Sequence, residues 1–286
     1  MAVVTCAALL AALAGPGGGK TFTLNEDCAG IEVRHYHAAP VTIDAAGHLL
    51  TGVVVEQDAG NVVLKGGVIT AAGGEGAAGR PGYALLLRGA RDVRVENMRF
   101  VRFNRGIVTD MAERITVVNS RFEMGQDGII ANGGGALDFS DNEFLAVSFR
   151  PTTCALGGAV EEGLSARDCK TKGGQWRDGW HQDAIQLRNG IVGVRVVGNK
   201  ISGVQQGIGQ MDASTDAPMR DIVVRDNEVS ITGFHSITFG RASNVEIAEN
   251  SVRQETGRKT VIRVYEEARV CGNLVMGSRK LGGPKC

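Results

Sequence analysis

A unit of eight residues recurs along most of the chain and limits what the chain can fold into. Each copy reads apolar-x-apolar-x-x-slot-x-apolar, where x is any residue and the slot is one fixed position. The slots fall at Gly67, Met98, Ser120, Asn142, Asn199, Asn227, Asn250 and Asn273, separated by 31, 22, 22, 57, 28, 23 and 23 residues. The alternation is typical of a β-strand, and the units are too short to hold a crossover helix. The repeat therefore predicts a solenoid of stacked parallel strands.

Asparagine occupies five of the eight slots. A buried Asn must satisfy its amide donors and its carbonyl, which side chains stacked at one turn of successive coils can do for one another. This pattern resembles the asparagine ladder of the pectate-lyase-like superfamily, over roughly residues 41–276. The resemblance implies an all-β fold, a single right-handed parallel β-helix of about 8–9 coils with one such strand per coil. Met98 and Ser120 depart from the ladder pattern in the first coils.

A second column lies upstream of the slots and marks another strand in each coil. It consists of a small residue followed by an aliphatic one, and the residues just before it are Tyr83, Arg105, Asp127, Asp183, Gln206 and His235, with Arg258 or Lys259 expected next. Spacings between the two columns place insertions near residues 71–82, 146–180 and 212–218. All three flank the same strand face, and loops on a rigid scaffold often carry function. In the superfamily that the chain resembles, such loops wall a glycan-binding cleft.

Asp127 and Asp183 share one position of the repeat. If the 146–180 insertion is a loop without a coil of its own, the two lie on adjacent coils, about 4.8 Å apart. Two carboxylates at this distance raise one pKa, as acid/base catalysis requires, or they can bind Ca²⁺ through their oxygens. The structural alternative is that each Asp caps a turn before a small residue. Calcium is the only cofactor that the pattern suggests.

Other polar and aromatic residues gather around this column. His181 and His235 are candidate proton carriers, although a lone His is often structural. Candidate sugar-binding residues, each with a plain surface or packing alternative, are Arg105, Gln186, Arg188, Gln206, Trp176, Trp180 and Lys259. Cationic side chains can neutralise a sugar carboxylate, and an indole can cover a sugar ring.

The chain carries 31 basic and 31 acidic residues, so no net positive charge attracts nucleic acid. Residues 1–14 are mostly apolar and end in Ala12-Leu13-Ala14, which predicts a signal peptide and export to the periplasm or medium, although a basic start is missing. The apolar run is too short to span a membrane. Residues 15–40 would form a stub and cap, 41–276 the β-helix and 277–286 a tail.

Six cysteines are present, and export favours disulfides. Cys154 with Cys169 could close a loop, and Cys271 with Cys286 could hold the tail. Cys28 would be left over if Cys6 is removed with the signal. Buried free thiols are the alternative.

The resemblance implies an exported, monomeric carbohydrate-active enzyme acting on a uronic-acid-containing polysaccharide by β-elimination. Hydrolysis by the paired aspartates and uronate epimerisation are alternatives, and so is a β-helix that binds glycan without catalysis. The order Asp127-Gly128-Ile129, Asp183-Ala184-Ile185, His235-Ser236-Ile237 also has a positional likeness to polygalacturonases. There, however, the second motif is an Asp doublet, and the His lies one coil earlier. Fold analogy alone does not define an activity.

Overall fold

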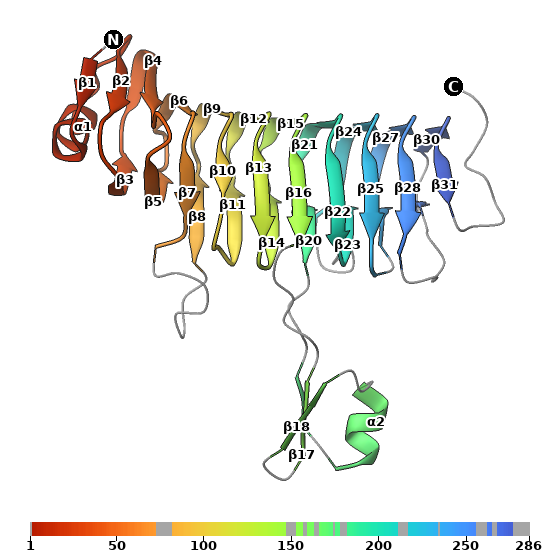
Figure 1. The fold of residues 1–286 in the computed structure, drawn as a ribbon. Coiled ribbons are helices and arrows are strands. Elements are labelled where there is room, and N and C mark those ends of the chain that lie inside the picture. The colour runs from red at the N-terminus through yellow and green to blue at the C-terminus, as the bar shows by residue number, and fades with distance from the viewer. Residues whose placement is uncertain are drawn as a thin grey trace.

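The computed structural model describes residues 2–72, 82–146, 182–210, 217–233, 235–255, 262–264 and 268–276. Within the long insertion it describes residues 153–156, 159–162, 166–173 and 175–177, with side chains for 169–173 only. The side chain of Met124 is likewise outside the description. The chain winds into a parallel β-helix whose coils succeed one another from the N-terminal to the C-terminal end (Figure 1).

Each regular coil contributes three strands, one to each of three parallel stacks (Figure 1). The first stack runs β1 (Ala2–Val4), β2 (Thr21–Leu24), β4 (Tyr36–Asp44), β6 (Gly60–Lys65), β9 (Arg91–Glu96), β12 (Glu113–Val118), β15 (Gly135–Ser140), β21 (Val192–Val197), β24 (Met219–Arg225), β27 (Ala242–Ala248) and β30 (Ala268–Cys271). The second runs β7 (Val68–Thr70), β10 (Arg99–Phe100), β13 (Arg121–Met124), β16 (Glu143–Ala146), β22 (Lys200–Val204), β25 (Glu228–Ile231), β28 (Ser251–Gln254) and β31 (Leu274–Met276). The third runs β3 (Cys28–Val33), β5 (Leu49–Val55), β8 (Tyr83–Arg88), β11 (Arg105–Asp110), β14 (Asp127–Asn132), β20 (Asp183–Arg188), β23 (Gln206–Gly209), β26 (Ile237–Phe239) and β29 (Ile262–Val264), with β5 pairing to both β7 and β8.

The structure confirms the all-β parallel solenoid but changes its details. The sequence predicted two strands in each coil, one from the repeat unit and one from the second column. The structure adds a third, the short strand of the second stack, of which β10 is an example. The first stack has 11 strands, more than the expected eight or nine coils. The additional strands come from residues 2–44, where β1 pairs with β2, β2 with β4 and β4 with β6. The β-helix therefore includes residues that we expected to form a stub.

In the strands of the three stacks, alternating residues point into one continuous core, which the Val, Ile and Leu of the repeat fill. Phe100, Phe122 and Phe144 occupy one column of the second stack, and their rings stack at centroid distances of 4.4 and 4.6 Å. Burial of this apolar surface is the main favourable term in the folding free energy.

The predicted asparagine ladder joins the first and second stacks. Asn142, Asn199, Asn227, Asn250 and Asn273 are buried. Each of the first four donates its amide to the side-chain oxygen of the next, at 2.9–3.1 Å.

The same column continues through the residues that depart from the asparagine pattern. The backbone N–H of Ser120 donates to Asn142 Oδ1 at 2.9 Å, and that of Met98 donates to Ser120 Oγ at 3.2 Å. The N–H of Gly67 lies 3.3 Å from Met98 Sδ. A hydroxyl and a thioether can thus accept the turn N–H where the amide is absent, because one acceptor is enough at that point.

The long insertion carries a small structure of its own and adds no coil to the β-helix. It contains an antiparallel sheet of β17 (Thr153–Leu156), β18 (Ala159–Glu162) and β19 (Gln175–Arg177), with helix α2 (Ala166–Thr171). On either side of it, β14 pairs directly with β20 and β16 with β22. Cys169 is disulfide-bonded, but the side chain of Cys154 lies outside the described residues, so the predicted Cys154–Cys169 bond stays a prediction. Cys271 is disulfide-bonded as well, and Cys286 lies outside the description.

Residues that we expected to form a signal peptide cover the first coil. Strand β1 pairs with β2, and helix α1 (Cys6–Leu13) buries Leu9 and Leu13 in the core. A disulfide joins Cys6 to Cys28, so Cys28 has a partner as long as Cys6 is retained. Cleavage after residue 14 would remove this cap, and it remains a prediction.

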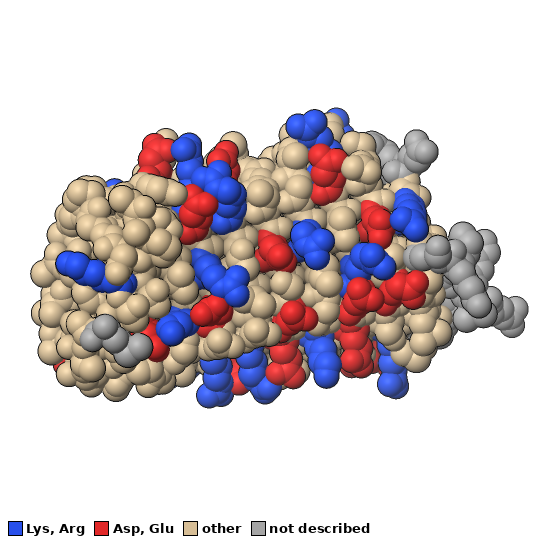
Figure 2. All heavy atoms as spheres, turned by 90° about the horizontal axis from the view of Figure 1, so that it is seen from above, with Lys and Arg blue, Asp and Glu red and all other residues tan. Residues whose placement is uncertain are grey.

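Basic and acidic side chains are intermixed over the face that Figure 2 displays. Ion pairs between neighbouring coils occur among the described residues, for example Arg114 with Asp92 at 2.6 Å and Arg225 with Glu246 at 3.5 Å. That face therefore carries no large patch of one sign. None of the helices in the described ranges has the length and apolar character needed to cross a membrane.

Candidate functional site

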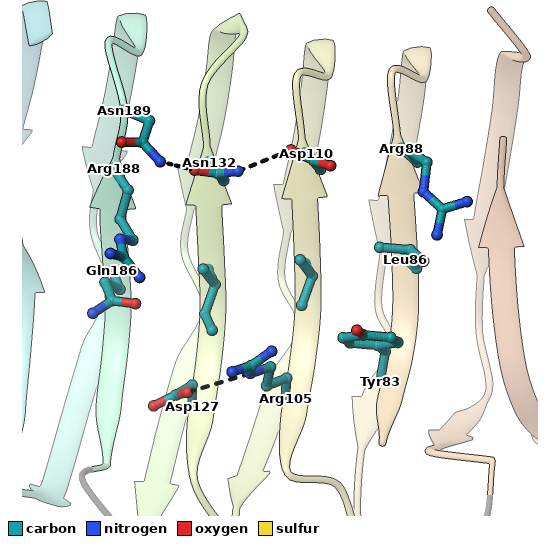
Figure 3. A pocket seen from close by; sticks show the side chains of 12 residues that line it. Tyr83, Leu86, Arg88, Arg105, Asp110, Asp127, Asn132, Gln186, Arg188 and Asn189 are labelled. Carbon is teal, nitrogen blue, oxygen red and sulfur yellow. Dashed lines mark hydrogen bonds and ion pairs between the residues drawn. The ribbon is translucent and has the colours of Figure 1, made fainter. Parts of the chain in front are cut away.

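An open cleft of about 380 Å³ lies on the outer face of the third stack, over β8, β11, β14 and β20 (Figure 3). Its lining forms three rows that cross these strands. One row lies where the strands begin, one at their middle and one where they end. Because the strands pair in register, each row holds residues from equivalent positions of successive coils.

The row at the strand starts contains Tyr83, Arg105 and Asp127, which face one another across neighbouring strands (Figure 3). Asp183 holds the equivalent position on β20, because Ile129 lies opposite Ile185 two residues further on. The structure thus places the two aspartates on adjacent coils, as the repeat predicted.

A small residue follows this row because the backbone is crowded there. A Cβ on Gly106 would lie 2.5 Å from the carbonyl oxygen of Gly128, and one on Gly128 would lie 2.6 Å from that of Ala184. Contacts this short would force the backbone to shift. The Gly after Arg105 and the Gly after Asp127 therefore let the strand starts pack closely beneath the cleft.

Asp127 is the electrostatically unusual group of the site. Its carboxyl is buried, and this burial raises its pKa to about 7. The guanidinium of Arg105, with Nε 3.9 Å from Oδ2, and a hydrogen bond from the backbone N–H of Asp183 act in the opposite direction. Near neutral pH the group therefore populates both protonation states, which suits a general acid or base.

Asp183 has a different environment from Asp127. Its side chain is buried, its Oδ2 accepts a hydrogen bond from Gln186 Nε2 at 3.3 Å, and it is not among the described residues that line the cleft. The two aspartates are adjacent but do not face the cleft as an equivalent pair. Asp183 offers Asp127 its backbone N–H, and a catalytic role for the two carboxyl groups as a pair stays a prediction.

The middle row is apolar over three strands, with Leu86, Val108 and Ile130, and ends in Gln186 on β20. The residues of each neighbouring pair lie opposite one another in the ladder. This row gives the cleft a floor against which the C–H groups of a ligand can pack.

The row at the strand ends contains Arg88, Asp110, Asn132 and Arg188, with Asn189 next to it (Figure 3). Sequence reasoning selected Arg188 but missed Arg88, Asp110 and Asn132. A signal was present, since each lies five residues after its partner in the first row. Arg88 forms an ion pair with Glu56 at 3.2 Å.

Other predicted residues lie outside this cleft or outside the description. Gln206 continues the first row on β23, opposite Asp183, and His235 follows one coil later with Nδ1 3.3 Å from Thr238 Oγ1. Neither is among the described lining residues. His181, Trp180, Arg258 and Lys259 lie outside the described residues, as does the side chain of Trp176.

The donor set around Asp127 does not fit calcium well. Ca²⁺ takes six to eight oxygen ligands, whereas among the described residues no group of three or more His, Cys, Asp or Glu side chains could hold a metal. The guanidinium of Arg105, next to Asp127, would also repel a cation.

No protein-family model matches the chain, and neither does any curated protein. Among solved structures, it is similar to an alginate lyase from Paenibacillus sp. str. FPU-7, with a TM-score of 0.48 and 14% sequence identity over 96% of each chain. This likeness is too distant to bear on the fold or the activity. What defines the chain is a parallel β-helix with an open, arginine-rich cleft on its third stack.

Proposed function

We propose that the protein is a polysaccharide lyase that cleaves a uronic-acid-containing glycan by β-elimination in this cleft. The observation that carries the proposal is the pair formed by Asp127 and Arg105. It combines a carboxyl whose pKa is about 7 with a guanidinium 3.9 Å away. A proton acceptor next to a fixed cation is what removal of a proton beside a carboxylate requires.

The charge of the lining favours an acidic ligand. Three guanidinium groups line the cleft, from Arg88, Arg105 and Arg188, against two carboxyl groups, from Asp110 and Asp127. Guanidinium groups pair with carboxylates in a planar, two-point geometry. A uronate carboxylate is therefore a better partner for this surface than a neutral sugar.

The chemistry assigned to these residues needs no water. Arg105 binds the sugar carboxylate and stabilises the negative charge that develops on it, while ionised Asp127 accepts the proton from C5. The C4–O4 bond breaks, a C4=C5 double bond forms, and the protonated Asp127 can return its proton to the leaving oxygen. The products are an unsaturated uronate and a new chain end.

Hydrolysis by two carboxyl groups fits this cleft less well. Glycosidases hold their carboxyls about 5–5.5 or 6.5–9.5 Å apart. The carboxyl residues that line the cleft, Asp110 and Asp127, lie at opposite ends of paired strands. Since Asp110 pairs with Asn132, five residues beyond Asp127, their offset is about 16 Å at ~3.3 Å per residue.

The test is incubation with a panel of uronans, followed by ultraviolet absorbance of the unsaturated product and by chain length. We expect absorbance from wild type, loss of it in Asp127→Asn, and no change in Asp138→Asn. Asp138 is a matched control because it lies on β15 in the first stack, away from the cleft. New reducing ends without absorbance would indicate a hydrolase, and altered uronate configuration at constant chain length would indicate an epimerase. Retention on a polysaccharide gel without turnover would indicate a binding module.

A further inference from the structure

The row at the strand ends contains a hydrogen-bonded chain that the proposed reaction does not use. Asn132 donates its amide to Asp110 Oδ1 at 2.8 Å, and Asn189 donates its own to Asn132 Oδ1. We call Asp110, Asn132 and Asn189 the outer polar ladder (Figure 3). Like the buried Asn ladder, it links side chains of successive coils by hydrogen bonds, but it lies on the outer surface of the β-helix.

The carboxylate of Asp110 fixes the direction of the outer polar ladder. A carboxylate only accepts hydrogen bonds, so Asn132 must turn its NH₂ group toward Asp110. Its carbonyl oxygen then faces Asn189, which must donate in turn. Every side chain keeps at least one group with no described protein partner: a carboxylate oxygen on Asp110, an N–H on Asn132, and a carbonyl oxygen and an N–H on Asn189.

Solvent access separates the outer polar ladder from the buried one. Asp110 and Asn132 are half-buried, and Asn189 is exposed. Hydrogen bonds between groups that water can also reach contribute little net stability. All three residues line the cleft, so their remaining donors and acceptors are available to a ligand there.

The outer polar ladder is remote from the reacting groups. Asn132 lies five residues beyond Asp127 on β14, a distance of about 16 Å at ~3.3 Å per residue. The apolar floor of Leu86, Val108 and Ile130 lies between the two rows. One pyranose ring is too short to touch both rows, so the two rows contact different sugar units.

We propose that the outer polar ladder is a distal subsite, which binds the free hydroxyl groups of a sugar unit remote from the bond that is cleaved. This inference rests on the proposed function, and it specifies the length of the substrate and the state of its hydroxyl groups. The substrate is an oligosaccharide or longer uronan, and the hydroxyls at the ladder carry no acetyl or sulfate ester. An ester would remove the donor that Asp110 accepts, and a sulfate would bring a second negative charge to it.

The experiment compares kcat/KM for a long and a short oligouronate in wild type, Asp110→Asn and Asn189→Gly. Asp110→Asn keeps the shape but no longer fixes the amide directions. Asn189→Gly removes the side chain while glycine accepts the positive φ of 54° at this position. Asp138→Asn serves as the control, and melting curves check that each variant is folded.

We expect kcat/KM for the long substrate to fall about ten- to hundredfold in both variants, which is the equivalent of one or two hydrogen bonds. The loss should fall mainly on KM, and activity on the short substrate should not change. Wild type should also discriminate against an O-acetylated long uronan, and Asp110→Asn should discriminate less. Equal losses on both lengths, or no loss on either, would overturn the distal subsite while the lyase proposal stands. Failure of wild type to turn over any uronan would contradict both the lyase proposal and the distal subsite.

Discussion

Asp127 and Asp183 stand on adjacent coils and meet through unlike groups, because the carboxylate of Asp127 accepts a hydrogen bond from the backbone N–H of Asp183. This contact and Arg105 lower the pKa of Asp127, but burial outweighs them and raises it to about 7. The same burial that prepares the group for proton transfer has a cost in stability whenever the group is ionised.

The first prediction concerns this cost. The pKa of Asp127 is higher in the folded than in the unfolded chain, so the folded state binds the proton more strongly. Its contribution to stability is complete below the unfolded pKa near 4 and is lost as pH rises through about 7. The full loss is about 4 kcal/mol as an order of magnitude.

Asp127→Asn should therefore be more stable than wild type at pH 8 and inactive at every pH. Denaturant unfolding at pH 5 and pH 8 measures the difference, with Asp138→Asn as the control. A variant that is destabilised equally at both pH values would show that Asp127 is not the buried, titrating group.

The second prediction concerns the buried Asn ladder. Asn227 donates to the carbonyls of Val196 and Arg225 and to Asn250 Oδ1, at 2.8–2.9 Å, and its own oxygen accepts from Asn199. Leucine at this position removes the acceptor of the buried Asn199 backbone N–H and all of these side-chain hydrogen bonds, and each buried group left without a partner costs about 1–3 kcal/mol. We expect Asn227→Leu to lower the free energy of unfolding by at least about 3 kcal/mol.

The control for this variant is Asn244→Gly, on the surface of β27. Asn244 has a φ of 50°, which glycine accepts, and its amide bonds only to Asp221 among the described residues. Thermal melting should separate the two variants clearly. Equal midpoints for Asn227→Leu and wild type would contradict the ladder as a source of stability.

The sequence predicted most of the fold because the relevant forces repeat at every coil. Apolar alternation and a buried amide therefore recur in the sequence with the period of the coils. Even Asn142 and Asn199, which are 57 residues apart, are joined by a hydrogen bond of 3.1 Å. The strands of the second stack were hard to recognise in the sequence because they are short; β10, for example, has only two residues. Ser120 and Met98 depart from the asparagine pattern and still continue the column, because the ladder needs an acceptor at that point and not specifically an amide.

The candidate site was only partly predictable. The row of Arg105 and Asp127 precedes a small residue that packing requires, and this made it visible in the sequence. Asp110 and Asn132 lie at the ends of their strands without such a marker. The different environments of Asp127 and Asp183 could not be predicted, because burial depends on three-dimensional packing and not on repeat position.

The third prediction concerns the N-terminal cap. Leu9 of α1 is fully buried, and Cys6 of the same helix is bonded to Cys28. Leu9→Ala should lower the free energy of unfolding by about 2–5 kcal/mol, as other buried leucines do. Ala8→Asp should have little effect, because Ala8 is exposed in the first turn, where a negative charge is favourable.

Peptide mapping of the non-reduced protein from its native source checks the cap independently. A cross-linked peptide containing Cys6 and Cys28 would show that the cap is retained. A mature chain that begins near Gly15 would show that it is removed, and Leu9→Ala would then leave the mature protein unchanged.

The last prediction concerns Arg105 and the pH dependence of turnover. The guanidinium of Arg105 lowers the pKa of Asp127, so its removal in Arg105→Gln raises that pKa above about 7. If ionised Asp127 accepts the substrate proton, activity appears only as pH rises through its pKa. The acidic limb of kcat/KM should therefore move to higher pH, together with a loss of activity at the plateau, since the sugar carboxylate has lost its partner.

Arg121→Gln removes an arginine from β13 in the second stack, where its partners are Glu123 and Glu143, and should leave the acidic limb in place. A limb that stays in place in Arg105→Gln, with only the plateau reduced, would assign the proton transfer to a group other than Asp127.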